Sequence, residues 1–322
     1  MLDDQAQTFL NLQCAAQRPG WESLGVERAR EMFASLTDWF GDGTGSVDTE
    51  DFQVPVSDGH RIRCRLYRPA TSRGDSPTGV VMFFHGGGFV LGDLNTHDTM
   101  CRRLATASGT AVVSVEYRCS PESPHPGPID DCEAATRHVA RTSDRWNIDA
   151  SRMVVTGDSA GGYLAMAVAI RLRDRLPTDG AAIRPRLLML IYPVVSPACD
   201  TPSHIAFADG HGLTRATMAW FWSQYLGDVQ WRADEVDLLH QPLVGLPPTH
   251  IITAGYDVLR DEGLELVDAM RRSGIRVTHQ SYDGMLHGFI HFAGLFDRSR
   301  DATDAVGRRI RETLSSNFGT HS

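Results

Sequence analysis

A strand pattern, a glycine-rich turn and a helix pattern follow one another without a break between residues 152 and 171. Met153 to Thr156 is a short apolar run that predicts a strand, and Tyr163 to Ile170 is an alanine-rich run that predicts a helix. The turn between them reads GDSAGG, in which glycines on either side of Ser159 permit a sharp reversal of the backbone. A serine in such a turn is exposed at the sheet edge and at the positive end of the helix. Ser159 is therefore a candidate nucleophile, although a bare glycine-rich turn often occurs by chance.

The composition sets limits on the partners and the compartment. With 322 residues, 42% of them hydrophobic and 22% charged, the chain has the profile of a soluble globular protein with a large core. Its 40 acidic and 31 basic residues give a net charge of −9 without basic clusters, which argues against nucleic acid and anionic lipid. No apolar run approaches the ~18 residues of a membrane-spanning helix. The acidic N-terminus shows no secretory signal, and the six scattered cysteines form no C-x-x-C pair, so we expect a cytoplasmic protein without a zinc site or disulfide framework.

Strand patterns alternate with helix patterns from residue 79 onward, which is typical of a parallel sheet covered by helices on both faces. Two alternating stretches before this region, separated by a polar turn, predict an antiparallel hairpin. We therefore predict an α/β fold with one eight-stranded, mostly parallel sheet. The expected strands are Phe52 to Val56, Arg61 to Tyr67, Val80 to Phe84, Ala111 to Tyr117, Met153 to Thr156, Leu187 to Ile191, Ile251 to Ala254 and Val277 to Tyr282.

Two parts of the chain fall outside this alternation. Residues 1–45 show helical periodicity before the first strand, and residues 196–246 interrupt the strand and helix pattern. Within the interruption, the expected helix Leu213 to Leu226 has a stripe of aromatic residues on one face. We interpret residues 1–45 as cap helices and 46–322 as the main domain, with 196–246 as a cap insertion. A plain core helix is the alternative for Leu213 to Leu226, because aromatic stripes usually only pack.

A serine nucleophile also needs hydrogen-bond donors for the negative charge that develops on the attacked oxygen. The run His85-Gly86-Gly87-Gly88 directly follows the expected strand Val80 to Phe84. Consecutive glycines let backbone N–H groups converge without a Cβ in the way. We therefore predict an oxyanion hole made by the N–H groups of Gly87, Gly88 and Ala160, with no metal ligand among these residues.

The nucleophile further needs a base, and the base needs an acid that orients it. In a parallel sheet these groups lie in loops after the carboxyl ends of strands. Asp257 and His287 follow the last two expected strands, and the order Ser, Asp, His is that of one known class of catalytic triad. Asp261 is the alternative acid, but it begins the next helix and is expected to cap it. We predict that Ser159, Asp257 and His287 are catalytic.

These motifs together resemble the hormone-sensitive-lipase-like carboxylesterases, a bacterial branch of the α/β-hydrolases. The resemblance runs from about residue 50 to the C-terminus and implies the α/β-hydrolase fold with a helical cap. It also implies that Ser159 is the nucleophile, His287 the base and Asp257 the acid, and that His85 shapes the loop of the oxyanion hole. The matching motifs are HGGGF at 85–89, YR at 117–118, PE at 121–122, DDC at 130–132, GDSAGG at 157–162, DVLRDEG at 257–263 and HGF at 287–289.

The expected activity is hydrolysis of short-chain acyl esters through an acyl-enzyme intermediate, without cofactor or metal. The small-molecule ester would bind between the sheet edge and the cap. Two alternatives stay open, a non-catalytic small-molecule-binding protein of the same fold and an acyltransferase or dehydratase using the same site. The resemblance slightly favours a homodimer. The candidate substrate-binding walls are Phe33, Trp39, Phe89, Met218, Trp222 and Phe289.

Overall fold

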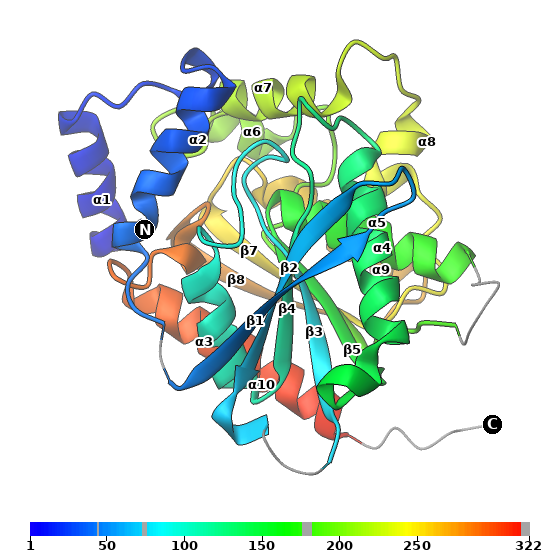
Figure 1. Ribbon diagram of the computed structural model, residues 1–322. Coiled ribbons are helices and arrows are strands. Elements are labelled where there is room, and N and C mark those ends of the chain that lie inside the picture. The colour runs from blue at the N-terminus through cyan, green and yellow to red at the C-terminus, as the bar shows by residue number, and fades with distance from the viewer. Residues whose placement is uncertain (44, 73–75, 176–181, 317–322) are drawn as a thin grey trace.

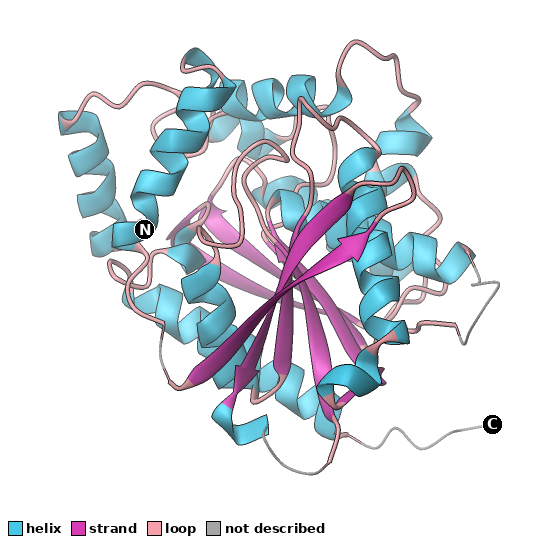
Figure 2. Ribbon diagram, viewed as in Figure 1, coloured by secondary structure: helices cyan, strands magenta, loops and turns pink. Residues whose placement is uncertain are grey.

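Eight strands form one twisted sheet with helices on both sides, as Figure 1 and Figure 2 show. The computed structural model describes residues 1–43, 45–72, 76–175 and 182–316. The strand order is β1-β2-β4-β3-β5-β6-β7-β8, in which β2 is antiparallel to both of its neighbours and the other pairs are parallel. This confirms the predicted sheet. The strands are β1 (Val47–Pro55), β2 (Arg61–Pro69), β3 (Thr78–Phe84), β4 (Ala111–Glu116), β5 (Ile148–Asp158), β6 (Leu187–Ile191), β7 (Thr249–Tyr256) and β8 (Val277–Leu286).

The burial of each strand explains its sequence pattern. Every residue of β6 is buried, and its sequence LLMLI is a continuous apolar run because helices cover both faces of the central sheet. The edge strand β1 instead has only Phe52 and Val54 buried, and its polar residues point to water. The central strands therefore bury the core and hold their carboxyl ends at one common edge.

Helices form two layers around the sheet. The helices α3 (Asp98–Ser108) and α10 (Asp297–Ser315) pack with one face, together with part of α1 (Asp4–Ala15). The opposite face buries α4 (Gly127–Arg141), α5 (Ala160–Asp174) and α9 (Arg260–Arg272). The predicted arrangement of helices on both faces is confirmed.

The helices of the N-terminal segment and of the inserted region lie towards the carboxyl edge of the sheet, in the upper half of Figure 1. A hydrogen bond of 2.7 Å from Thr217 Oγ1 to Glu22 Oε2 ties the inserted region to the N-terminal segment. The two regions therefore meet above the carboxyl edge. The N-terminal elements are α1, η1 (Trp21–Ser23), α2 (Val26–Ala34) and η2 (Ser35–Trp39), and the inserted elements are α6 (Pro202–Ala206), α7 (Arg215–Leu226), α8 (Ala233–Val236) and η5 (Leu238–His240).

The element boundaries differ from the predicted ones at a few places. The strand β5 begins at Ile148 and not at Met153, because Ile148 pairs with Thr78 although most of the residues between are polar. The inserted region holds α6, α8 and η5 besides the expected helix, since short turns leave little periodicity in the sequence. The predicted boundary at residue 45 follows residue 44, which lies outside the described residues.

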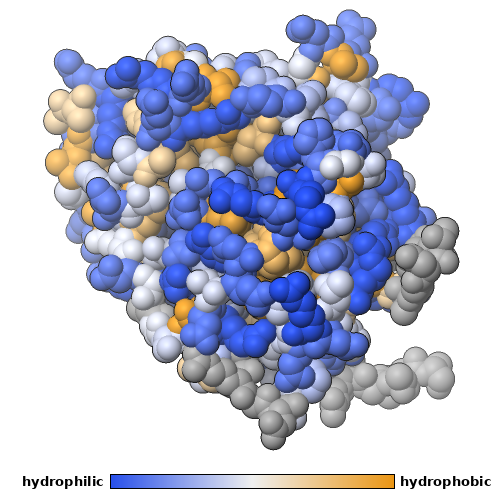
Figure 3. Space-filling view, viewed as in Figure 1, coloured by the Kyte–Doolittle hydropathy of each residue, from blue (hydrophilic) through white to orange (hydrophobic). Residues whose placement is uncertain are grey.

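The surface in Figure 3 is mostly hydrophilic, with small apolar patches scattered between charged side chains. Such isolated patches are normal on folded proteins. Within the described ranges, no helix combines the length and the apolar character required to cross a membrane.

Candidate active site

Ser159 lies at the junction of β5 and α5, at the carboxyl edge of the sheet (Figure 1). Its φ of 55° and ψ of −120° are strained for a residue with a side chain. The Ser159 N–H donates to the carbonyl of Ile191 at 2.8 Å, and its own carbonyl accepts from the N–H of Val194 at 3.1 Å. The loop after β6 therefore holds the strained turn in place, as expected for a nucleophile that must project from the sheet.

The glycines of this turn allow β3, β5 and α5 to approach closely. A Cβ added at Gly161 would overlap the carbonyl oxygen of Phe84 at the end of β3. A Cβ at Gly157 would overlap the backbone of Gly161, and one at Gly162 would lie 2.9 Å from the Cβ of Pro193. All three positions therefore require glycine for packing, in agreement with the predicted role of the motif.

We expect Gly161→Ala to lower the free energy of unfolding by about 2 to 4 kcal/mol, because its Cβ meets backbone that cannot rotate away. Helix propensity alone predicts the opposite sign, since alanine is favoured over glycine within α5 by about 1 kcal/mol. Urea unfolding measures the difference. The control Gly274→Ala has no atom within 4 Å of the added Cβ. Its φ of +78° adds backbone strain, which should lower the free energy of unfolding by only about 1 kcal/mol. Equal stability of Gly161→Ala and the wild type would contradict the packing argument.

Three side chains from distant parts of the chain form a hydrogen-bonded relay. Ser159 Oγ lies 2.9 Å from His287 Nε2, and His287 Nδ1 lies 2.7 Å from Asp257 Oδ2. Asp257 follows β7 directly and His287 follows β8, so the parallel sheet brings both loops beside the end of β5. The predicted triad residues are thus within hydrogen-bond reach of one another.

The buried carboxylate of Asp257 orients the imidazole of His287. Its Oδ1 accepts a hydrogen bond of 2.9 Å from the backbone N–H of Leu259, which leaves Oδ2 for the histidine. A carboxylate can only accept, so Nδ1 of His287 donates, and in the neutral imidazole Nε2 is free to accept the hydroxyl proton of Ser159. The arrangement suits proton removal from a serine nucleophile.

The alternative acid, Asp261, lies elsewhere. It occupies the first turn of α9, and its carboxylate accepts a hydrogen bond of 2.7 Å from Nε of Arg260. The expected capping role is wrong, because Leu259 occupies the N-cap position and the N–H of Asp261 itself donates to Ser203 Oγ at 3.1 Å. The carboxylate that reaches His287 is that of Asp257.

The predicted oxyanion donors border the cavity beside Ser159. Gly87 and Gly88 line it, with φ of +105° and +61°, which are conformations that favour glycine. Ala160 begins α5, so its N–H lies at the positive end of a 15-residue helix. Among the described residues, none accepts a hydrogen bond from the backbone N–H of Gly87, Gly88 or Ala160. These donors are available to a bound oxygen, as an oxyanion hole requires.

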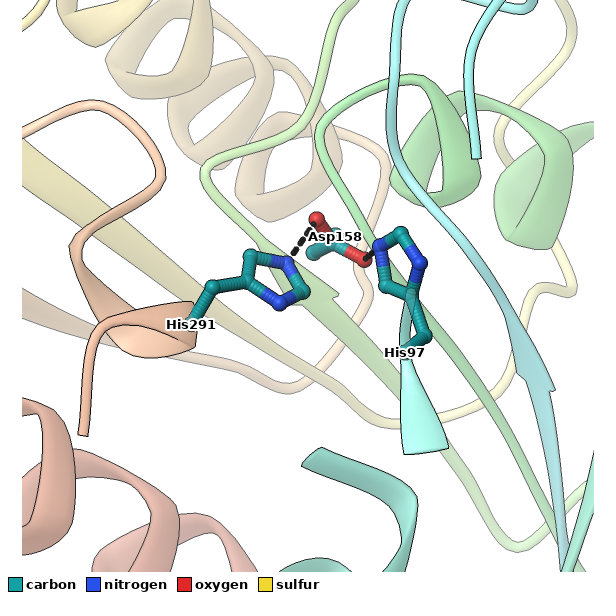
Figure 4. A group of neighbouring side chains, drawn as sticks. All are labelled: His97, Asp158 and His291. Carbon is teal, nitrogen blue, oxygen red and sulfur yellow. Dashed lines mark hydrogen bonds and ion pairs between the residues drawn. The ribbon is translucent and has the colours of Figure 1, made fainter. Parts of the chain in front are cut away.

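Asp158, next to the nucleophile, is the centre of a buried polar cluster (Figure 4). Its Oδ1 accepts the N–H of Gly86 at 2.9 Å, and its Oδ2 accepts Nε2 of His291 at 2.8 Å. Burial by itself would raise the pKa of Asp158, but His291, which hydrogen-bonds to its carboxylate, holds that pKa below its ordinary value. Burial also lowers the pKa of His97 well below its ordinary value, so this imidazole is neutral near pH 7. His97 and His291 were not identified from the sequence. The one sequence feature that pointed to such partners was the acidic Asp158 inside the glycine-rich turn.

His85 shapes the glycine loop without contacting the relay. Its carbonyl accepts the hydroxyl of Tyr117 at 2.7 Å, and its ring stacks on the same tyrosine at a centroid distance of 4.1 Å. Its Nδ1 contacts the carbonyl of Gly86 at 2.9 Å. These contacts fit the structural role that the family resemblance implies for His85.

The relay opens into a cavity of about 140 Å³ between the sheet edge and the helices above it. Its lining includes Phe33 and Met218, as predicted from the sequence. Most of its walls are apolar, whereas one wall is polar and is formed by His97, Asp158 and His291. The other apolar lining residues are Phe9, Trp21, Leu36, Leu91, Leu213, Phe221 and Phe292.

Four of the predicted wall residues lie outside this lining. Phe89 is buried beneath α7, stacked on Tyr225 at 3.9 Å, and Trp222 packs against it. Phe289 is buried against Tyr282 on the other side of the sheet. Trp39 packs on the edge of Phe9 and not on the cavity. We correct these four assignments, because three of the rings fill core layers next to the site and Trp39 is half-buried under Arg18.

Comparison with known proteins agrees with the fold and the geometry. The chain is 38% identical over 253 residues to esterase LipI of Mycobacterium tuberculosis, covering 76% of this chain and 75% of the relative. It is 30% identical over 298 residues to an ethyl acetate hydrolase of Pseudomonas putida, covering 91% and 92%. These similar proteins are carboxylic ester hydrolases by name.

Solved structures give the same result. An ester hydrolase from the metagenome of Lake Arreo superposes with a TM-score of 0.91 at 34% identity, covering 98% of this chain and all of that one. An esterase of Pyrobaculum calidifontis gives a TM-score of 0.87 at 33% identity, with coverage of 98% and 100%. The family model described as alpha/beta hydrolase fold matches residues 81–291. The chain therefore belongs to the α/β-hydrolase fold family, in its hormone-sensitive-lipase-like branch of carboxylic ester hydrolases.

Proposed function

We propose that this enzyme hydrolyses short-chain acyl esters, with Ser159 as nucleophile, His287 as base and Asp257 as the acid that orients the base. The observation that supports this most directly is the relay of 2.9 Å and 2.7 Å hydrogen bonds at the wall of a small apolar cavity. The named activities of similar proteins point to the same bond type.

The first half of the reaction forms the acyl-enzyme. His287 Nε2 takes the hydroxyl proton of Ser159 while Oγ bonds to the ester carbonyl carbon. The resulting oxyanion accepts hydrogen bonds from Gly87, Gly88 and Ala160. The tetrahedral intermediate then breaks its bond to the alkoxy oxygen, which leaves as the alcohol with the proton held by His287.

Water completes the cycle in the second half. His287 removes a proton from the water while the water oxygen bonds to the acyl carbon. The same three N–H donors hold the second oxyanion. Collapse breaks the bond to Ser159 Oγ, which takes the proton back from His287, and releases the carboxylic acid. Each proton moves between groups of this chain, the ester and water.

We expect kcat/KM to be higher for p-nitrophenyl acetate and butyrate than for the octanoate and palmitate. The cavity is smaller than typical ligand sites of roughly 300 Å³ and more, and Phe33, Met218 and Phe221 border it. Initial rates with the four esters measure the preference. Faster turnover of the palmitate than of the butyrate would contradict it.

A truncation of the cavity wall tests the same argument. Met218→Ala should shift the preference towards octanoate, because it lengthens the space beside Ser159. Met270→Ala truncates an equally buried methionine on α9, outside the cavity lining, and should leave the ranking of the esters unchanged. If both variants lose stability, the comparison still holds, because it concerns the ranking of the esters within each variant.

The relay argues against a protein that only binds its ligand, since binding does not need a serine in hydrogen-bond contact with a base. Product analysis separates the activities that the same site could perform. Hydrolysis releases acid and alcohol in water, acyl transfer converts an added alcohol to a new ester, and elimination gives an unsaturated product. We expect the acid and the parent alcohol as the main products in water.

We also propose a cytoplasmic location and a homodimer. All six cysteines are free thiols, which suits a reducing compartment. The strand β8 lies at one edge of the sheet, where a second copy could pair with it.

A further inference from the structure

One group of side chains outside the relay has the composition of a metal site. His97, Asp158 and His291 each offer one ligand atom, and these atoms lie within 4.8 Å of one another. Their side chains are only 1%, 4% and 8% exposed. Figure 4 shows the two imidazole rings on opposite sides of the carboxylate. Imidazole and carboxylate are common ligands of first-row transition metals.

The hydrogen bonds of Thr96 allow His97 to carry its proton on Nδ1. The Thr96 hydroxyl donates to the carbonyl of Asp93 at 3.0 Å, and its oxygen also lies 3.0 Å from Nδ1 of His97. Thr96 Oγ1 also accepts the N–H of Asp93 at 2.8 Å, and its single proton can serve either Asp93 or His97. In the tautomer in which Asp93 takes that proton, Nδ1 of His97 donates to Thr96. In a neutral imidazole the other nitrogen, Nε2, then presents a lone pair.

This lone pair points at another electron-rich atom. Nε2 of His97 lies 3.8 Å from Oδ1 of Asp158, and it hydrogen-bonds to none of the described residues. It is also buried from solvent in this conformation. Two buried acceptors that face each other at this distance attract a small cation rather than a hydrogen-bond donor of the substrate.

The spacing fits a transition-metal ion. Zn²⁺ binds imidazole nitrogen at about 2.0 to 2.1 Å and carboxylate oxygen at about 2.0 to 2.2 Å. Two ligand atoms 3.8 Å apart can therefore share one ion between them. His291 adds a third ligand if its Nε2, now 2.8 Å from Oδ2 of Asp158, turns its lone pair to the ion. All three residues line the cavity, so a fourth ligand could come from that side.

We propose that His97, Asp158 and His291 bind a transition-metal dication such as Zn²⁺, and that this ion inhibits the enzyme reversibly. The nitrogen ligands disfavour Mg²⁺ and Ca²⁺, which prefer oxygen. Bound metal draws the Asp158 carboxylate away from the N–H of Gly86 and from His291, and so displaces the glycine loop that bears the oxyanion donors. The inhibition rests on the proposed ester hydrolysis, whereas the binding does not.

Cobalt binding tests the site without any enzyme turnover. We expect Co²⁺ added to the full-length protein to give visible absorption bands that saturate at one equivalent and that Zn²⁺ abolishes. His97→Gln and His291→Gln should each weaken the binding by about tenfold or more. Circular dichroism checks that the variants are folded. If only one of them folds, its cobalt binding is sufficient for the test.

Two further histidine variants serve as controls. His250→Gln removes a buried histidine of β7 that bonds Thr278 Oγ1 at 2.7 Å, away from the cluster, and should leave cobalt binding unchanged. His287→Asn removes the base of the relay and should also leave it unchanged. Binding that is lost in His287→Asn but kept in His97→Gln would place the ion at the relay and overturn the proposal. An absence of saturable binding would overturn it as well.

The inhibition is tested on p-nitrophenyl butyrate. Zn²⁺ should suppress wild-type turnover, a chelator should restore it, and His97→Gln should require about tenfold more Zn²⁺ for the same suppression. Equal sensitivity of the wild type and His97→Gln would overturn the inhibitory role. A protein that binds cobalt at the cluster but never turns over esters would refute the proposed function and leave the metal site standing.

Discussion

Ser159→Ala is expected to lower kcat for p-nitrophenyl butyrate by a factor on the order of 10⁴ to 10⁶. Oγ of Ser159 is the atom that forms the acyl bond, and it lies 2.9 Å from the nitrogen that takes its proton. Without it, the oxyanion donors and the cavity can still bind the ester, so the residual rate should exceed that in water. Initial-rate measurements on purified wild type and variant, with product identity checked by chromatography, give the factor.

A second serine provides a matched control. Ser114 on β4 is fully buried and lies outside the cavity lining, so Ser114→Ala removes a hydroxyl away from the site. We expect its kcat to stay within a few-fold of the wild-type value. Near-normal turnover by Ser159→Ala would place the nucleophile elsewhere and would reject the proposed mechanism.

The sequence was sufficient to predict the relay because topology positions it. Each of Ser159, Asp257 and His287 directly follows a strand, and parallel strands end at one edge of the sheet. Once the alternation of strands and helices predicted the sheet, the three loops had to converge. The glycines around Ser159 added the local geometry, since only residues without a side chain permit the close contact with Phe84.

The cavity walls were less predictable, because residue type does not say which face of an element a ring occupies. Met218 and Trp222 lie one turn apart on α7, yet the first lines the cavity while the second packs on Phe89. Phe9 and Trp21 reach the cavity only through tertiary packing of the N-terminal segment, which no local pattern encodes.

The cluster at Asp158 was unpredictable for a different reason. A buried carboxylate needs partners, but its partners lie far away in the chain, with His97 at the N-cap of α3 and His291 at the end of the short helix η6 (Phe289–His291). Neither histidine lies within a motif that marks it as a partner of Asp158, although His291 comes two residues after the HGF motif at 287–289. The identity of these partners therefore depends on the tertiary structure.

Asp257→Asn is expected to lower kcat by about 10³ to 10⁴ while leaving the fold intact. The N–H of Leu259 donates to Oδ1 of Asp257, so the amide oxygen of the asparagine will occupy that position. Its NH₂ group then faces Nδ1 of His287, which must become the acceptor. The proton of the neutral imidazole moves to Nε2, and Nε2 can no longer take the proton of Ser159.

The neighbouring acid supplies the control for this substitution. Asp261→Asn alters a carboxylate that pairs with Arg260 and has no contact with His287, so its kcat should remain within a few-fold of the wild-type value. Rates of the two variants with p-nitrophenyl butyrate decide between the acids. If Asp261→Asn were the inactive variant and Asp257→Asn the active one, the hydrogen bond of 2.7 Å from His287 to Asp257 would not be the one that orients the base.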